Sequence, residues 1–220
     1  MSEHGHIERF GVVPVVVLEH SDTALKLAEA LLQGGLPLLE ITLRTETAPL
    51  AIAAVRKAFP EIWCGAGTVI RQPGNDGLQK ALDAGAQFIV SPGFDPGIVA
   101  DALDAGVAPY PACSTGTDIM AALSFGVKTL KFFPAEALGG VKVLKALHGA
   151  FAHTGVKFMP TGGVSEKNLA DYLSLDAVLA CGGTWMASAE AIQAGAWSTI
   201  TEQAKRAVAL AAEIRAKKST

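Results

Sequence analysis

The amino-acid sequence predicts a (β/α)8 barrel, and three observations support this fold class. One phrase occurs three times, with a helix end and a glycine preceding an apolar strand. The copies follow one another at about 20 residues, the length that one strand plus one helix requires. Eight short apolar runs alternate with eight helical patterns along the 220 residues. The three copies of the phrase occupy residues 81–88, 102–109 and 122–129.

The strand candidates are apolar runs bordered by glycine, proline or polar turn residues, as expected for parallel strands that are buried on both faces. We expect one such strand before each helix, with the side chains alternating between the barrel interior and the helix layer. The predicted strands lie at residues 12–18, 36–43, 62–66, 87–91, 107–111, 129–134, 157–161 and 177–181.

The helices are predicted from apolar periodicity and from capping residues at their starts. Ser165 and Asn168 begin one of them, and Ser114 and Thr115 are interpreted as a cap because no histidine completes a nucleophilic triad. A short additional helix is predicted at residues 3–9, at the barrel floor. No linker divides the chain, so residues 1–220 are expected to form one domain. The helical patterns lie at residues 23–33, 47–59, 77–84, 96–105, 117–125, 141–148, 166–173 and 197–217.

Composition narrows the classes of partner. The chain has 18 Lys and Arg against 21 Asp and Glu, and its net charge of −3 argues against nucleic acid or an anionic membrane surface. The longest apolar run, residues 10–18, is far shorter than the roughly 20 residues of a membrane-spanning helix. Three widely spaced cysteines fit a reducing cytoplasm better than a disulfide framework.

The second predicted strand carries polar side chains on one face. Period two places Glu40, Thr42 and Arg44 together, opposite a leucine and isoleucine face that suits the helix layer. The polar face therefore points into the barrel, and Arg44 lies at the carboxyl-end mouth, where barrel enzymes keep their sites. A glutamate is rarely buried without a purpose, which favours a functional role. The alternative is a structural pair between Glu40 and Arg44.

Lys131 differs from the other lysines because its neighbours in the sixth predicted strand are Leu130, Phe132 and Phe133. Burial disfavours an ammonium group, and a neutral amine can attack a ketone to form a Schiff base. The alternative is a lysine that only pairs with Glu40. The two interpretations are compatible, since imine chemistry also needs a partner that exchanges protons.

Two glycine pairs end the last two predicted strands and indicate a phosphate site. Gly162 and Gly163 follow the seventh strand, and Gly182 and Gly183 follow the eighth. Exposed backbone N–H groups and a helix N-terminus hold phosphate at this position in many barrels, and the hydroxyl of Thr184 could add to them. Each pair could equally form an ordinary turn.

Two other strand ends are less specific. Thr68 could donate a hydrogen bond to a carboxylate, and the glycines before it would let the backbone approach a ligand. Pro92, between Ser91 and Gly93, lies in a turn of similar ambiguity. The five histidines do not form a set of metal ligands, so we expect neither a catalytic metal nor another cofactor.

Five motifs in order resemble the family of 2-dehydro-3-deoxy-6-phosphogluconate aldolase, which is also credited with 4-hydroxy-2-oxoglutarate cleavage. The resemblance runs from about residue 12 to the last helix. The motifs are LEITLRT at residues 39–45, GAGTV at 65–69, KFFPAE at 131–136, PTGGV at 160–164 and GGTW at 182–185.

The resemblance implies a class I, metal-independent aldolase that is a cytoplasmic homotrimer of (β/α)8 subunits. It implies that the Schiff-base residue is Lys131 and the general acid and base Glu40. The pyruvoyl carboxylate would then bind Arg44 and Thr68. Further roles follow from the same motifs: Pro92 and Phe133 line the pocket, Thr161 affects stereoselectivity, and the phosphate binds Gly162, Gly163, Gly182, Gly183 and Thr184.

Two positions depart from the family pattern. Thr184 stands where serine is common, so its methyl group could crowd the phosphate. Ala112 stands where glycine is common, close to the expected pocket. The substrates implied are pyruvate and a phosphorylated 2-keto acid. The alternatives to an aldolase are a phosphosugar epimerase or isomerase barrel and a non-catalytic phosphosugar-binding barrel.

Overall fold

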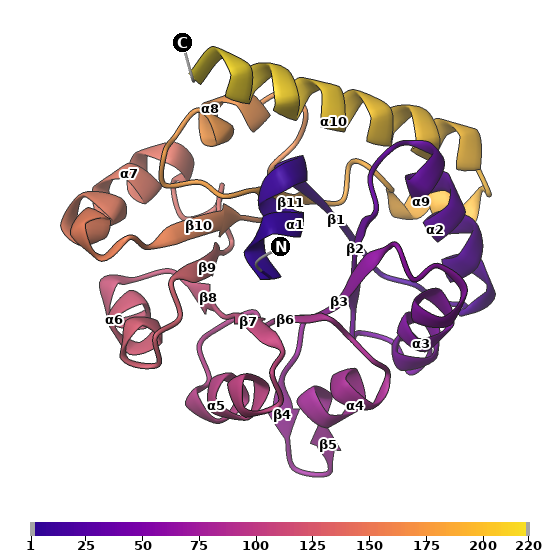
Figure 1. The fold of residues 1–220 in the computed structure, drawn as a ribbon, viewed down its shortest axis with the longest axis horizontal. Helices are drawn as coiled ribbons and strands as arrows, with labels where there is room; N and C mark the ends of the chain where they lie inside the picture. The colour runs from indigo at the N-terminus through magenta and orange to yellow at the C-terminus, as the bar shows by residue number, and fades with distance from the viewer. Residues whose placement is uncertain (1–2, 219–220) are drawn as a thin grey trace.

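The computed structural model describes residues 3–218, in which parallel strands form a ring inside a layer of helices (Figure 1). The helices lie outside the ring because each connects two parallel neighbours and covers their outer apolar face. The strands of the ring are β1 (Val12–Val16), β2 (Leu38–Thr42), β3 (Trp63–Gly67), β6 (Phe88–Val90), β7 (Ala108–Tyr110) with its continuation β8 (Ala112–Cys113), β9 (Thr129–Phe132), β10 (Lys157–Pro160) and β11 (Cys181–Gly183).

The ring closes through two seams. One sheet runs in the order β11-β1-β2-β3-β6-β7 and the other in the order β10-β9-β8. Only Pro111 separates β7 from β8, which joins the sheets on one side. On the other side, parallel bridges join Phe158 to Val178 and Thr161 to Gly182. The predicted (β/α)8 barrel is therefore confirmed.

The helices follow the strands as predicted. Thr115 caps α6 together with Asp118 in a reciprocal pair of hydrogen bonds, which confirms its interpretation as a cap. A 3-10 turn, η1 (Ala152–Thr154), extends α7. The helices are α2 (Asp22–Gln33), α3 (Ala48–Ala58), α4 (Gly77–Asp83), α5 (Pro96–Asp104), α6 (Gly116–Ser124), α7 (Gly140–Phe151), α8 (Leu169–Leu173) and α10 (Trp197–Lys218).

The predicted N-terminal helix is present as α1 (Glu3–Phe10). It packs against β1 and α10, buries Ile7 completely, and lies across one opening of the ring (Figure 1). Since α1 leads directly into β1, this opening is at the amino-terminal ends of the strands. The opposite, carboxyl-terminal opening is left for a site.

Three features differ from the sequence prediction. The last strand was expected at residues 177–181, but β11 covers Cys181–Gly183. Residues 177–180 are apolar because they are buried, and they pair with β10 through one bridge only. The short helix α9 (Ala189–Gln193) and the hairpin of β4 (Arg71–Gln72) and β5 (Asn75–Asp76) were not predicted. Among residues 3–218, no helix is both long enough and apolar enough to span a membrane.

Candidate active site

A cavity of about 160 Å³ lies where the carboxyl ends of β1, β2, β3, β9, β10 and β11 meet. Most of the predicted site residues line it. The wall on the side of β1 is formed by Val15, Val16 and Val17, which were not predicted as site residues. The predicted residues among its lining are Arg44, Thr68, Lys131, Phe133, Thr161, Gly162, Gly163, Gly183 and Thr184.

Lys131 lines this cavity and lies beside Glu40, which is not itself among the lining residues. Lys131 comes from β9 and Glu40 from β2, and both side chains point into the barrel, as the alternation along each strand predicts. They are 6 % and 1 % exposed, and the lysine Nζ lies 3.7 Å from Glu40 Oε1. That separation is too long for a direct hydrogen bond but short for two charged groups.

The Glu40 carboxyl group is placed to exchange a proton. Burial raises its pKa above the ordinary 4.5, and the neighbouring Lys131 and Arg44 cations offset only part of that shift. Its buried Oε1 receives no hydrogen bond from any residue between 3 and 218. A buried polar atom without a partner is uncommon in a folded protein, and here it faces the lysine that sequence analysis selected.

Gly67 makes room for this carboxylate. The register of β2 and β3 sets Thr42 beside Gly67, and a Cβ at Gly67 would lie 2.2 Å from Glu40 Oε1. No real Cβ could occupy that position without moving the carboxylate. The glycine of the GAGT motif was interpreted as a residue that lets a ligand approach, whereas in the structure it accommodates a catalytic candidate of the neighbouring strand.

Arg44 and Thr68 form the polar wall above the pair. Arg44 Nε donates a hydrogen bond to Thr68 Oγ1 at 3.2 Å, across the ends of β2 and β3. Thr68 has a φ of 54°, a left-handed conformation that is costly for a β-branched residue. The guanidinium keeps N–H groups for a planar anion such as a carboxylate, which arginine can bind with two parallel bonds.

An aromatic ring completes the surroundings of the lysine. The ring of Phe133 lies 4.9 Å from Lys131 Nζ, measured to the ring centroid, and lines the cavity. Pro92 is exposed and is not among the residues that line the cavity, so its contact with substrate stays a prediction.

The turn at Gly162 and Gly163 presents unused backbone donors. Both residues have left-handed conformations, with φ of 95° and 82°. Within residues 3–218, nothing accepts a hydrogen bond from the N–H groups of Gly162, Gly163 or Val164. Consecutive free N–H groups in such a turn form a concave site for an anion.

The sequence predicted that the N-terminus of the next helix would add N–H donors to the phosphate site, and the structure does not show this. The helix after this turn was predicted from residue 166, but α8 begins only at Leu169 and has five residues. The side chain of Asn168 accepts a hydrogen bond from the N–H of Ser165, which holds this stretch as a loop. The anion donors are therefore those of the turn itself.

The second glycine pair lies inside β11 and not in a turn after it. A Cβ at Gly182 would lie 2.5 Å from Thr161 Oγ1, and one at Gly183 would overlap the ring of Trp185 at 1.7 Å. Gly183 and Thr184 line the cavity, whereas Gly182 does not. Gly182 is thus placed to give Thr161 space. The predicted turn is not formed at this pair, and phosphate binding by Gly182 stays a prediction.

Comparisons with known proteins agree with this geometry. The family model described as aldolase, KDPG and KHG aldolase, matches residues 5–203. A 2-dehydro-3-deoxy-phosphogluconate aldolase of Treponema pallidum is 47% identical over 195 residues, which is 89% of this chain and 90% of that protein. This chain belongs to the KDPG and KHG aldolase family.

Two solved structures of the family show ligands. The KDPG aldolase of Legionella pneumophila, with pyruvate captured as a covalent carbinolamine, has a TM-score of 0.87, 38% identity, and coverage of 94% of this chain and 98% of its own. The aldolase of Zymomonas mobilis ZM4 with 3-phosphoglycerate has a TM-score of 0.85, 36% identity, and coverage of 95% and 96%. Relatives therefore bind pyruvate covalently and take a phosphorylated ligand.

Ala112, one of the two departures from the family pattern, lies directly beside the predicted Schiff-base residue. The register of β8 and β9 pairs Ala112 with Lys131, and Ala112 is buried. The other departure, Thr184, lines the cavity. Both substitutions thus lie where they could change the shape of this family member's pocket.

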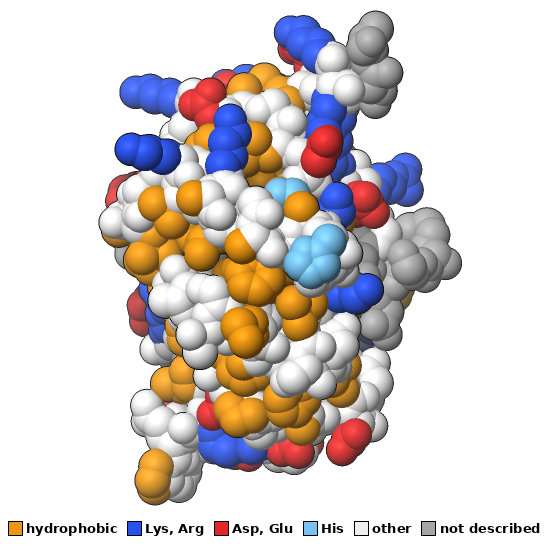
Figure 2. Space-filling model, turned by 90° about the vertical axis from the view of Figure 1, so that its left-hand side faces the viewer, with side chains coloured by type: hydrophobic (Ala, Val, Ile, Leu, Met, Phe, Trp, Pro, Cys, Tyr) orange, Lys and Arg blue, Asp and Glu red, His pale blue; other side chains and the backbone are white. Residues whose placement is uncertain are grey.

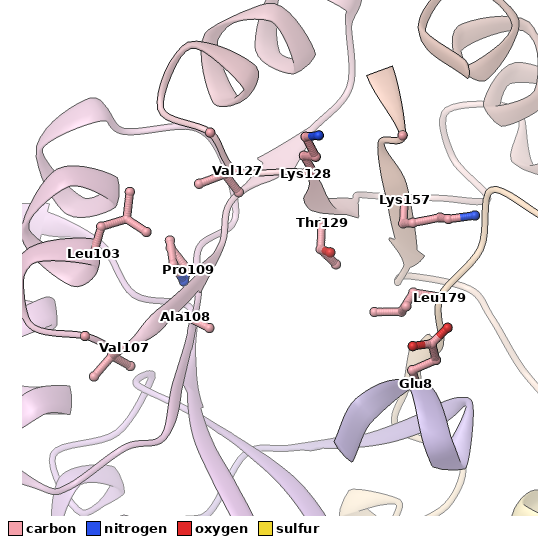
Figure 3. A pocket seen from close by; sticks show the side chains of 13 residues that line it. Glu8, Leu103, Val107, Ala108, Pro109, Val127, Lys128, Thr129, Lys157 and Leu179 are labelled. Atoms are coloured by element: carbon pink, nitrogen blue, oxygen red, sulfur yellow. The ribbon is translucent and has the colours of Figure 1, made fainter. Parts of the chain in front are cut away.

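A cavity larger than the candidate site lies at the other end of the barrel. It measures about 590 Å³ and lies among the amino-terminal ends of β7, β9 and β10. Figure 3 shows Thr129 directed into it from β9 and Glu8 directed toward it from α1. No cluster of three potential metal ligands occurs anywhere in the part of the chain that the structure describes.

Proposed function

We propose that this chain is a class I aldolase that cleaves 2-dehydro-3-deoxy-6-phosphogluconate to pyruvate and D-glyceraldehyde 3-phosphate. 4-Hydroxy-2-oxoglutarate, cleaved to pyruvate and glyoxylate, is its second substrate. The observation that carries the proposal is the buried pair of Lys131 and Glu40 in the barrel of a chain that belongs to the KDPG and KHG aldolase family. A lysine amine and a carboxyl group of raised pKa are the two groups that Schiff-base chemistry requires.

The first half of the reaction forms the imine. The neutral amine of Lys131 adds to the C2 ketone and gives a carbinolamine. Glu40 donates a proton to the departing hydroxyl, which leaves as water, and the protonated imine remains. Burial raises the pKa of Glu40, so this carboxyl group keeps its proton to a higher pH than an ordinary glutamate and can donate it in this step.

The second half breaks the carbon chain. Glu40, now a carboxylate, removes the proton of the C4 hydroxyl through one bridging water. The C3–C4 bond breaks, its electron pair moves into the iminium, and the aldehyde leaves. Protonation of the enamine at C3 and addition of water to the imine then release pyruvate and restore the free lysine.

The remaining residues of the cavity orient the substrate. Arg44, held by Thr68, binds the pyruvoyl carboxylate, and Phe133 packs beside the imine carbon. Thr161 lines the same cavity as Lys131, and we assign it the stereochemical role at C4 that the resemblance implies. The free N–H groups of the Gly162–Gly163 turn, with Gly183 and Thr184, bind the phosphate and place the reacting carbons.

Reductive trapping tests this proposal. Incubation with pyruvate and borohydride should add a stable carboxyethyl group to Lys131, located by peptide mass spectrometry. A Lys131→Ala variant is the matched control and should gain no such mass. Failure of the wild-type protein to be trapped would sink the proposal, because a metal-dependent epimerase or a binding protein has no amine that captures pyruvate.

We further propose that the enzyme acts in the cytoplasm as a homotrimer of single-domain subunits. The low proportion of charged residues, 18%, leaves apolar surface to cover. Met120 on α6 and Phe125 just after it are 64 % and 37 % exposed. Figure 2 shows hydrophobic side chains gathered on the face that lies at the left of Figure 1, where α6 and α7 are found. The molar mass from light scattering should equal three chains.

A further inference from the structure

The Gly162–Gly163 turn needs support from outside its own loop. Glycine permits a left-handed conformation but does not enforce it, since it populates many others at similar cost. The short helix α8 begins six residues later and gives the turn no regular hydrogen bonds. A turn that must present its N–H groups to an anion therefore depends on neighbours that hold its carbonyl groups elsewhere.

Two residues hold the carbonyl oxygens of the turn. The N–H of Glu136 donates to the carbonyl of Gly162 at 3.0 Å, and Nδ2 of Asn168 donates to the carbonyl of Gly163 at 3.1 Å. Both acceptors of the turn are thus occupied by protein, whereas its donors are not. This arrangement keeps carbonyl oxygens, which would repel a phosphate, in bonds with the protein.

The side chain of Glu136 supports the turn by packing. A Cβ at Gly163 would lie 2.6 Å from both Cβ and Cγ of Glu136, so the turn rests directly on this side chain. The carboxylate of Glu136 accepts a hydrogen bond from the hydroxyl of Tyr172. Tyr172 is fully buried in α8, and its hydroxyl anchors the exposed side chain of Glu136 through this hydrogen bond.

We propose that Glu136, Tyr172 and Asn168 are positioning residues that hold the Gly162–Gly163 turn ready for the substrate phosphate. This inference rests on the proposed function, because it needs the phosphate to bind at the turn. The three residues touch neither Lys131 nor Glu40 in any described contact. Their loss should therefore weaken recognition of the phosphate and leave the imine chemistry intact.

The test compares two substrates in each variant. 4-Hydroxy-2-oxoglutarate has no phosphate, and it carries its second carboxylate directly on C4, closer to the imine than the phosphate ester on C6 of the other substrate. Tyr172→Phe removes one hydroxyl and keeps the buried ring. Asn168→Ala removes the half-buried side-chain amide that donates to the carbonyl of Gly163. We expect each to raise KM for the phosphorylated substrate about fivefold, the effect of one lost hydrogen bond. kcat for both substrates and KM for 4-hydroxy-2-oxoglutarate should stay within about twofold of wild type.

Ser174→Ala is the matched control, because its hydroxyl follows the same helix but donates only to the carbonyl of Asp171. Inorganic phosphate should also inhibit cleavage less in Tyr172→Phe and Asn168→Ala than in Ser174→Ala. Equal losses with both substrates, or no change with either, would overturn the inference. Pyruvate trapping in the same variants separates the two proposals. If Lys131 is still trapped and the ratio of KM for the phosphorylated substrate to KM for 4-hydroxy-2-oxoglutarate is unchanged, only this inference fails.

Discussion

The barrel has a cavity at each end, and the candidate catalytic groups lie at the smaller of the two. The amino-terminal end holds about 590 Å³ and the carboxyl-terminal end about 160 Å³. Thr129 and Lys131 lie two residues apart on β9, and they line the larger and the smaller cavity respectively. Only the smaller one has a buried carboxylate with an unpartnered oxygen among the described residues, and a left-handed threonine. Buried charge and backbone strain mark the site better than volume does.

The lysines at the two ends make the same contrast. Lys157, at the larger cavity, donates to the carbonyl of Asp176 at 2.7 Å and lies near solvent. Lys131 is buried against Phe133 and Glu40. Lys157 therefore binds a backbone carbonyl beside the larger cavity, whereas Lys131 brings an amine next to a buried carboxyl group.

The largest effect expected is that of Lys131→Ala. It should lower kcat for cleavage by at least about four orders of magnitude, because no other lysine between residues 3 and 218 lines this cavity and could form the imine. Lys157→Ala, at the other cavity, should stay within about twofold of wild type in the same steady-state assay. Comparable losses in both variants would abolish the distinction between the two ends.

Glu40→Gln should lower kcat by about 10²–10⁴-fold, the usual effect of removing a general acid and base. The wild-type rate should fall as the pH drops through the pKa of Glu40, because the carboxylate that accepts the C4 proton is then protonated. Since burial raises that pKa, this loss should occur above pH 4.5. The acid limb of the kcat profile should be absent in Glu40→Gln, and its persistence would assign the limb to another group.

Gly67→Ala should lower stability by about 1–3 kcal/mol, because its Cβ would overlap the Glu40 carboxylate. The kcat should fall with it, since the displaced carboxylate loses its position opposite Lys131. Gly93→Ala is the control, as a Cβ there meets no atom within 4 Å. Chemical denaturation and steady-state rates measure the two effects, and a fully active Gly67→Ala variant would contradict the packing argument.

Asp118→Asn should give the smallest effect, about 1 kcal/mol of stability with no change in kcat. Partial burial opposes the carboxylate, but hydrogen bonds from the N–H groups of Ser114 and Thr115 prevail and lower the pKa of Asp118. A lowered pKa contributes stability above the ordinary value of 3.8 and loses it as the pH falls through the folded-state value. The difference in melting temperature between variant and wild type should shrink on acidification, and a constant difference would argue against the cap.

The sequence predicted the barrel because alternation and helix spacing are local properties. Period two is enough to place Glu40 and Lys131 inside the ring, on strands 91 residues apart (131 minus 40). The same reasoning misplaced the last strand, since the apolar stretch at residues 177–180 is buried without forming a full ladder. Apolar patterns report burial, and pairing is a separate property that local patterns do not encode.

The sequence by itself determined which residue types face the barrel interior and which motifs end its strands. Only the tertiary structure decided what the glycines do: Gly67 admits Glu40, Gly182 admits Thr161, and Gly163 rests on Glu136. It also decided that Pro92 lies outside the cavity lining. The physical reason is that a glycine shows in the sequence that a Cβ is missing, whereas the atom that fills the space comes from a distant segment of the chain.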